Sequence, residues 1–250
     1  MCAGFLDQPV PFGIAHQGGH EVAPGNTMAA FEHAVALGYR YIETDVQVTA
    51  DGVLVVYHDD DLAPGTGRPR RIGDLSWEEV SQLRVGGEHP IPRFDDVVER
   101  FADVRFNVEP KNDASVDPLV AAIGRHDLLS RICVGSFSDR RLARMRSAVG
   151  PGLCRSPGPV ATGAILLAAV VWPRWRPPYA ALQIPPRQWG IPLVNRWIVG
   201  RYHRMGLQVH VWTINDEHEM RRLFDDGVDA IMSDKVSTLR RVLDEWSAPA

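Results

Sequence analysis

Hydrophobic and polar residues alternate with a period of two through residues 41–48, and this pattern predicts a β-strand. The apolar face of that strand carries Ile42, Val46 and Val48. The opposite face carries Glu43 and Asp45, which lie about 6.5 Å apart along an extended chain. Acidic residues are poor strand formers, and two carboxylates on one face repel each other. The strand therefore predicts a compensating positive charge, and a divalent cation is the simplest one.

The chain then turns back on itself. Residues 50–52, Ala-Asp-Gly, are typical of a hairpin, and residues 53–56 form a second apolar run. The connection is too short for a helix, so the second strand is predicted to be antiparallel to the first. Two registers are possible, with Glu43 or Asp45 opposite His58. In both registers His58 lies on the carboxylate face, because directly opposed residues point to the same side.

Apolar segments and helical periodicity alternate along the whole chain. Parallel strands are predicted at residues 12–15, 41–48, 104–109, 132–136, 152–154, 182–184, 208–212 and 230–232. Helices are predicted near residues 30–37, 77–83, 94–101, 142–149, 193–202, 218–224 and 236–246. Eight strand-then-helix units in 250 residues match the size of one (β/α)8 barrel, a TIM barrel. We therefore predict a single domain over residues 1–250, with the antiparallel strand as an insertion after the second barrel strand.

Composition narrows the class of protein. With 45% hydrophobic residues and a net charge of −4, the chain is expected to be globular and not to bind nucleic acid. Its three cysteines, Cys2, Cys133 and Cys154, are too few for a disulfide framework and are expected to be reduced thiols. The N-terminus lacks the features of a secretion signal, and the longest apolar run, residues 160–172, is too short to span a bilayer. A cytoplasmic location is expected.

The candidate catalytic residues follow the predicted barrel strands. In such barrels the active site is built at the carboxyl ends of the strands. The polar residues at or near these ends are His16, Glu43, Asp45, Glu109 and Lys111, and His58 returns beside them. Carboxylates 4–5 Å apart would cost roughly 3–4 kcal/mol per pair at an effective dielectric constant near 20. Oxygen ligands favour Mg²⁺ or Ca²⁺, histidines suit proton transfer, and a lysine suits a phosphate-like anion.

These residues belong to motifs that resemble the glycerophosphodiester phosphodiesterase family. The matching segments are residues 15–19 (Ala-His-Gln-Gly-Gly), 24–31, 42–46 (Ile-Glu-Thr-Asp-Val), 49–52, 55–59, 107–111 (Asn-Val-Glu-Pro-Lys), 136–137, 211–215 and 227–234. The resemblance implies a distorted barrel that hydrolyses glycerophosphodiesters to glycerol 3-phosphate and an alcohol. It implies His16 and His58 as acid and base, and Lys111 and Trp212 as substrate contacts. It also implies that Glu43, Asp45 and Glu109 bind one Ca²⁺ or Mg²⁺ ion.

Two positions depart from the family pattern. Gln17 stands where the family usually has arginine, and Gly25 stands where it usually has glutamate. Glutamine cannot make the charged, bidentate phosphate contact of arginine. The two changes remove one charge of each sign, so they are interpreted as a coupled exchange. Gln17 is still assigned to the substrate-binding residues.

Other functions remain as alternatives. Tryptophans and arginines follow the apolar run, in Trp172-Pro-Arg-Trp-Arg-Pro-Pro-Tyr179. Such residues can lie at a lipid interface, which would favour a weak membrane contact and lysophospholipase D or sphingomyelinase D-like activity. Gln17 and Gly25 instead favour a barrel that binds a phosphorylated ligand without turnover. For an active enzyme, water and a substrate hydroxyl are alternative nucleophiles, and the two histidines can exchange roles.

Overall fold

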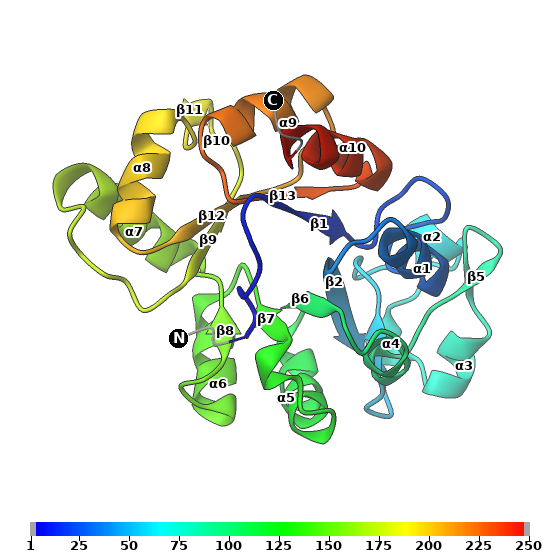
Figure 1. Ribbon diagram of the computed structural model, residues 1–250. Coiled ribbons are helices and arrows are strands. Elements are labelled where there is room, and N and C mark those ends of the chain that lie inside the picture. Colours follow the sequence, from blue (N-terminus) through cyan, green and yellow to red (C-terminus); the bar gives the residue numbers. More distant parts are fainter. Residues whose placement is uncertain (1–3, 248–250) are drawn as a thin grey trace.

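Eight parallel strands form the centre of the molecule (Figure 1). The structure is a computed structural model that describes residues 4–247. Within these residues the hydrogen-bonded strand order is β8-β7-β6-β2-β1-β13-β12-β9, a nearly closed barrel. The strands are β1 (Phe12–His16), β2 (Tyr41–Val48), β6 (Arg105–Pro110), β7 (Ile132–Val134), β8 (Cys154–Arg155), β9 (Ala181–Ile184), β12 (Gln208–Val211) and β13 (Ala230–Ser233). The predicted (β/α)8 barrel is therefore confirmed.

Helices surround this barrel on the outside (Figure 1). They are α1 (Met28–Ala36), α4 (Phe94–Arg100), α5 (Val116–Arg125), α6 (Asp139–Val149), α7 (Pro159–Val171), α8 (Arg196–Arg204), α9 (Glu217–Asp225) and α10 (Val236–Ser247). The predicted helices did not include α5, in which Pro118 and Gly124 obscure the helical pattern, or α7, in which residues 160–171 are apolar almost throughout. Leu119, Ala122 and Ile123 of α5 are nevertheless buried at helical spacing.

The inner and outer faces of the barrel have different compositions. Alternate residues of β2 and β6, such as Ile42 and Phe106, belong to the apolar core between the strands and the helices. At the amino end of the barrel interior, the rings of Phe12 and Tyr41 stack with centroids 4.5 Å apart. Towards the carboxyl end, the same face of β2 carries Glu43 and Asp45. The apolar part of the interior thus closes one end of the barrel, and polar residues occupy the other.

The antiparallel strand after β2 is present, but its register differs from both predicted registers. In β3 (Leu54–Val56), Leu54 lies opposite Val48 and Val56 lies opposite Val46. Continuing this register would place His58 opposite Thr44, on the face away from the carboxylates. The predicted pairing of His58 with Glu43 or Asp45 is therefore wrong. The loop is longer than expected because the Thr49 hydroxyl accepts a hydrogen bond from the backbone of Val53, at 2.9 Å.

An insertion between β3 and β6 forms a small layer beside the barrel. It contains α2 (Ala63–Thr66), α3 (Trp77–Ser81) and the short strands β4 (Arg84–Val85) and β5 (His89–Pro90). Its own apolar cluster includes Leu62, Ile72, Val80 and Ile91. The predicted capping box of α3 is present, since Ser76 and Glu79 bond each other's backbone. A second short hairpin, β10 (Arg187–Gln188) and β11 (Ile191–Pro192), follows β9.

The sequence predicted reduced cysteine thiols and no membrane-spanning helix. Cys133 is a buried free thiol, whereas Cys154 is disulfide-bonded, so the expectation of reduced thiols is wrong for Cys154. Cys2 lies outside the described residues. Among residues 4–247, no helix combines the length and the apolar character needed to cross a membrane.

Candidate active site

One cavity at the carboxyl ends of the barrel strands brings most of the predicted site residues together. Its volume is about 690 Å³. Seven of the eight predicted residues line it: His16, Glu43, Asp45, His58, Glu109, Lys111 and Trp212. They meet because parallel strands all end at the same edge of the barrel. Gln17 is the exception.

Three carboxylates lie on two neighbouring strands. Asp45 of β2 is the direct partner of Glu109 on β6, and Glu43 lies two residues before Asp45. Glu43 and Asp45 are buried, with 7% and 1% of their surface exposed. Burial and the charge of Asp45 raise the pKa of Glu43 to about 8. Burial also raises the pKa of Glu109 above its ordinary value, although Lys111 opposes this shift.

Lys111 follows β6 and lies between two of these acids. Its Nζ is 3.4 Å from Oδ1 of Asp45 and 3.3 Å from Oε2 of Glu109. Burial lowers the pKa of Lys111, but the charges of Asp45 and Glu109 outweigh this effect and raise it. Lys111 therefore remains a cation in the cavity and offers a positive charge to an anionic ligand.

The second oxygen of Asp45 is fixed by two amides from the loop after β1. Oδ2 accepts hydrogen bonds from Nε2 of Gln17 and Nδ2 of Asn26, each at 2.9 Å. Asn26 has a φ of +60°, and its side-chain oxygen accepts a hydrogen bond from the Thr44 hydroxyl at 2.7 Å. Both amides are held by backbone conformations of the loop, so Asp45 has little freedom to rotate.

Gln17 is part of this support and does not line the cavity. Its Oε1 accepts a hydrogen bond from Nε2 of His20 at 3.1 Å, while its Nε2 bonds Asp45. Gly25 makes room for this arrangement. A Cβ atom at Gly25 would lie 2.2 Å from Nε2 of His20 and 2.8 Å from Oε1 of Gln17. The structure thus places Gln17 behind Asp45, away from the position expected of a substrate contact.

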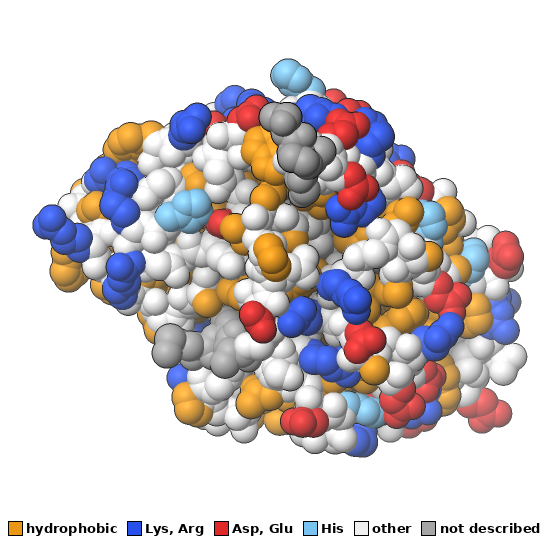
Figure 2. Space-filling view, in the orientation of Figure 1, with side chains coloured by type: hydrophobic (Ala, Val, Ile, Leu, Met, Phe, Trp, Pro, Cys, Tyr) orange, Lys and Arg blue, Asp and Glu red, His pale blue; other side chains and the backbone are white. Residues whose placement is uncertain are grey.

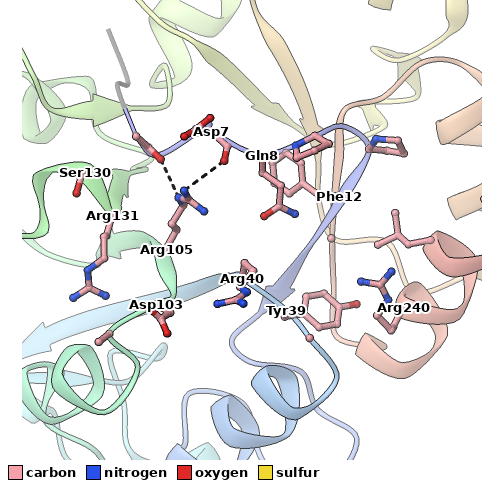
Figure 3. Close-up of a pocket in the computed structure, with 17 residues that line it drawn as sticks. Asp7, Gln8, Phe12, Tyr39, Arg40, Asp103, Arg105, Ser130, Arg131 and Arg240 are labelled. Atoms are coloured by element: carbon pink, nitrogen blue, oxygen red, sulfur yellow. Dashed lines mark hydrogen bonds between the residues drawn. The ribbon is translucent and has the colours of Figure 1, made fainter. Parts of the chain in front are cut away.

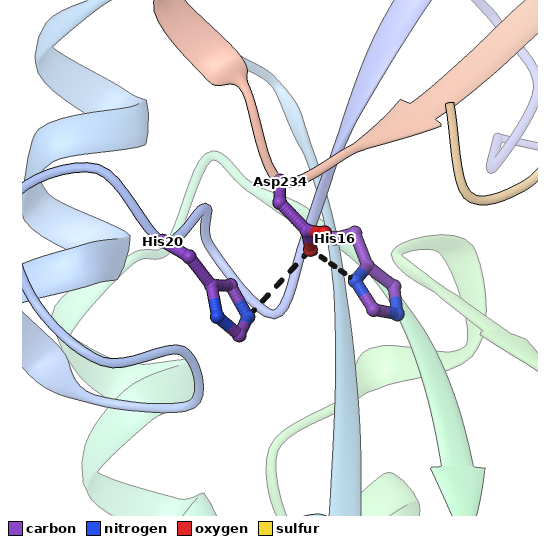
Figure 4. A group of neighbouring side chains, drawn as sticks. All are labelled: His16, His20 and Asp234. Atoms are coloured by element: carbon purple, nitrogen blue, oxygen red, sulfur yellow. Dashed lines mark hydrogen bonds and ion pairs between the residues drawn. The ribbon is translucent and has the colours of Figure 1, made fainter. Parts of the chain in front are cut away.

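His16 is oriented by an acid from the opposite end of the sequence (Figure 4). Its Nδ1 is 2.6 Å from Oδ1 of Asp234, which follows β13, and its Nε2 is 3.7 Å from Oε2 of Glu43. Burial lowers the pKa of His16, but the hydrogen bond to Asp234 and the charge of Glu43 outweigh it and raise the pKa to about 9. Burial would raise the pKa of Asp234, yet its hydrogen bonds from His16 and Asn215 lower it. Asp234 is therefore an anion that holds Nε2 of His16 toward the cavity.

His16, Asp234 and the nearby His20 form a second group of possible metal ligands, separate from the three predicted carboxylates. Ligand atoms of His16, His20 and Asp234 lie within 4.8 Å of one another, which is compatible with a metal site. However, the 2.6 Å separation between His16 and Asp234 is that of a direct hydrogen bond. We therefore interpret Asp234 as the residue that orients His16, and not as a metal ligand. Neither His20 nor Asp234 was among the predicted site residues, although Asp234 directly follows the last barrel strand, where a polar residue can be expected to reach the site.

His58 reaches the cavity after β3 has ended. Its Nδ1 is 2.7 Å from Oδ1 of Asp59, and half of its side chain is exposed. It is therefore more accessible to solvent than His16. The cavity consequently has two imidazoles in different environments, one buried beside the carboxylates and one at the rim.

The remaining wall of the cavity is largely apolar. It includes Phe137, Pro159, Leu166, Trp189 and Leu193. The ring of Trp212 packs edge-on against Phe137, with centroids 5.9 Å apart. Charged groups thus occupy the side formed by β1, β2 and β6, and apolar side chains occupy the side near α7.

Comparisons with known proteins find relatives of this chain in sequence and in fold. The model of the "Glycerophosphoryl diester phosphodiesterase family" matches residues 16–238. A Mycobacterium tuberculosis protein named "Probable glycerophosphodiester phosphodiesterase 2" is 35% identical, over 97% of this chain and 95% of its own. Among solved structures, a glycerophosphodiester phosphodiesterase from Agrobacterium tumefaciens has a TM-score of 0.77 at 24% identity, covering 94% of this chain and 99% of its own.

A second solved structure, also at 24% identity, contains a ligand. It is an Oleispira antarctica phosphodiesterase in complex with the product sn-glycerol-3-phosphate, with a TM-score of 0.78 over 94% of this chain and 97% of its own. At this level of identity the two structures support the barrel fold. Since the family model covers most of the sequence and the M. tuberculosis relative aligns over nearly its full length, this chain belongs to the glycerophosphoryl diester phosphodiesterase family, a family of phosphodiesterase enzymes.

Proposed function

We propose that this protein hydrolyses glycerophosphodiesters to glycerol 3-phosphate and an alcohol. The observation that carries the proposal is the single cavity in which two imidazoles, three carboxylates and one lysine face a space of about 690 Å³. The M. tuberculosis relative has the corresponding name, and the O. antarctica phosphodiesterase binds sn-glycerol-3-phosphate as its product. A small phosphodiester is the substrate that matches both the charge and the size of this cavity.

We further propose that Glu43, Asp45 and Glu109 hold one divalent cation, Mg²⁺ or Ca²⁺. The donor chemistry fits, because all three are carboxylates and hard cations prefer oxygen ligands. The raised pKa of Glu43, about 8, also indicates that this buried acid lacks sufficient positive charge around it. When bound, such a cation would neutralise negative charge on the phosphoryl oxygens. Lys111 would add a second positive charge on the same side.

The two histidines would transfer protons on either side of the phosphate. With a pKa raised to about 9, His16 is protonated at neutral pH, and Asp234 keeps its Nε2 in the cavity. His16 can therefore donate a proton to the departing alkoxide. His58, at the accessible rim, would accept a proton from the attacking water. Trp212 would then pack against the substrate from the apolar side.

Turnover of glycerophosphocholine tests this proposal. We expect Mg²⁺- or Ca²⁺-dependent release of glycerol 3-phosphate, which a chelator abolishes and the added cation restores. His16→Ala and His58→Ala should each lower kcat by about 10²- to 10⁴-fold, the usual contribution of a general acid or base. His218→Ala, on the exposed side of α9, is the matched control and should retain full activity. Unchanged turnover in either active-site variant would refute the assignment, and binding without any turnover would favour a non-catalytic barrel.

A second candidate substrate class is lysophospholipids, and the apolar wall of the cavity favours it. Trp189 lines the cavity, yet 90% of its surface is exposed. Leu167 and Val171 of the neighbouring helix α7 and Trp172, which directly follows it, are also exposed, by 65%, 69% and 63%. Figure 2 shows basic side chains beside apolar ones over the α7 and α8 edge. An acyl chain next to the phosphodiester would cover these apolar groups, and the same surface could rest weakly on a membrane.

The effect of Trp189→Ala separates the two substrate classes. We expect kcat/KM for lysophosphatidylcholine to fall about tenfold, because burying a large apolar side chain contributes about 1.5–3 kcal/mol. Activity toward glycerophosphocholine should stay within about twofold. Trp246→Ala, which alters an exposed tryptophan on α10 that does not line the cavity, is the control. An enzyme that ignores lysophosphatidylcholine and does not co-sediment with liposomes would exclude this second candidate.

A further inference from the structure

A second cavity lies at the opposite end of the barrel, beneath the N-terminal segment (Figure 3). Its volume is about 900 Å³. Four arginines line it: Arg40 before β2, Arg105 at the start of β6, Arg131 before β7 and Arg240 on α10. Figure 2 shows the corresponding concentration of basic side chains near the middle of this face. Such a concentration is unusual in a chain whose net charge is −4.

Two of these arginines are bound to neutral partners. Arg131 donates hydrogen bonds to the backbone carbonyls of Val98, Phe101 and Val104, at 3.0–3.3 Å. Arg105 donates to the carbonyl of Gly4 at 2.9 Å, and its guanidinium lies 5.5 Å from the ring centre of Tyr41. Carbonyls and rings fix the position of a guanidinium but do not cancel its charge. Both arginines are therefore held in place as cations.

The other two arginines have unused donors. The side chain of Arg40 forms no hydrogen bond or ion pair with any residue in the described range 4–247. Arg240 pairs with Asp244 through Nη2, but its Nε is buried without a partner. Figure 3 shows Tyr39 between these two side chains. A buried N–H without an acceptor is costly, and the free donors of Arg40 remain available to an anion in the cavity.

Acidic residues balance this charge only in part, since Asp244 pairs with Arg240. Asp7 and Asp103 also line the cavity, so its wall holds four arginines against two aspartates. Neither aspartate lies within ion-pair distance of the four arginines among the described side chains. The wall is therefore net positive at any pH near neutral, because arginine does not lose its proton there.

We propose that this cavity is a binding site for a small phosphorylated anion, of the phosphomonoester or inorganic phosphate class. Arginine presents a planar set of donors that matches phosphate oxygens, and several guanidinium groups lining one cavity favour a multiply charged anion over a carboxylate. The volume suits one small molecule. The site is distinct from the candidate active site: Phe12 lines this cavity and His16 lines the other, and four residues of strand separate them by about 13 Å.

Calorimetric titration with inorganic phosphate tests the proposal. The active site could also bind phosphate, so the titration is carried out in a His16→Ala/Lys111→Ala background. We expect one saturable site to remain there, and adding Arg40→Gln should raise its Kd at least about tenfold, as loss of a charge-assisted contact predicts. Arg174→Gln, which removes an exposed arginine outside both cavities, should leave the Kd unchanged.

Arg40→Gln should not disturb the fold, because the Arg40 side chain forms no hydrogen bond or ion pair with the described residues. In the otherwise unaltered enzyme it should leave glycerophosphocholine turnover and the melting temperature without phosphate unchanged. Two results would overturn the proposal. One is loss of all phosphate binding in the active-site background, and the other is an equal Kd with and without Arg40→Gln.

Discussion

Glu43→Gln is expected to lower glycerophosphodiester turnover by at least about 10²-fold while stabilising the cation-free protein at alkaline pH. Loss of activity follows if Glu43 is a cation ligand, because removal of one preorganised electrostatic contact typically costs 10²- to 10³-fold. The gain in stability has a separate cause. Burial and the neighbouring Asp45 raise the pKa of Glu43 to about 8, so the folded state pays for a charge that the unfolded state carries freely.

The pH dependence gives this prediction its sign. Below the ordinary glutamate pKa near 4.5, Glu43 is protonated in both states and imposes no penalty. As the pH rises from 4.5 to 8, the unfolded state loses its proton first, and the folded state becomes progressively less stable. His16 acts in the same direction, because its pKa is raised to about 9 and its favourable charge is lost as the pH passes that value. A pKa shift of this size changes the free energy of unfolding by a few kcal/mol. Glutamine at position 43 removes the contribution of Glu43 to this change.

Thermal unfolding in chelator between pH 5 and pH 8.5 measures this effect. The wild-type melting temperature should fall over that range, and Glu43→Gln should flatten the curve. Adding Mg²⁺ or Ca²⁺ should restore wild-type stability at pH 8 but have little effect on the variant, since a ligand stabilises only the state that binds it. Glu88→Gln, at an exposed position outside the cavity, should behave as wild type. A parallel fall of both curves would mean that Glu43 is not a strained, buried acid.

Gly25→Glu, which restores the usual family residue, is expected to impair the enzyme. A Cβ at this position would lie 2.2 Å from Nε2 of His20 and 2.8 Å from Cβ and Oε1 of Gln17. The new side chain would push both residues away and release the amide of Gln17 from Asp45. Overpacking of this kind typically costs 1–3 kcal/mol of stability. Because misplacement of a catalytic group by about 1 Å can cost up to 10²-fold, we expect kcat/KM to fall about 10- to 100-fold.

Companion variants make this prediction specific. Adding Gln17→Arg and His20→Ala to Gly25→Glu clears the space and supplies a charged pair, so most of the lost activity should return. Gly124→Ala is the control, because a Cβ at this position in α5 meets nothing within 4 Å. Alanine there should be neutral or stabilise the helix by up to about 1 kcal/mol. The measurement is kcat/KM for glycerophosphocholine in the wild type, Gly25→Glu, the triple variant and Gly124→Ala. A fully active Gly25→Glu enzyme would contradict the coupling of positions 17, 20 and 25.

The coupling also explains why Gln17 does not line the cavity, although a substrate contact was expected of it. A residue beside His16 in a glycine-rich loop was expected to point at the substrate, by comparison with the arginine of the family. Gln17 instead has a φ of +52° and turns its amide to Asp45, and His20 completes the contact through the space that Gly25 leaves. No local pattern indicates this, because the partners belong to different parts of the loop and to β2.

The sequence by itself determined the barrel and the carboxylate face. The period-two alternation of β2 depends only on the local backbone, so it was sufficient to place Glu43 and Asp45 together, and Asp45 indeed lies beside Glu109. Only the tertiary structure decided the register of β3 and the pairing of His16 with Asp234, which is 218 residues away. It also brought Arg40, Arg105, Arg131 and Arg240 around one cavity. These arrangements depend on which strands become neighbours and how long each loop is, and both follow from the packing of the whole chain.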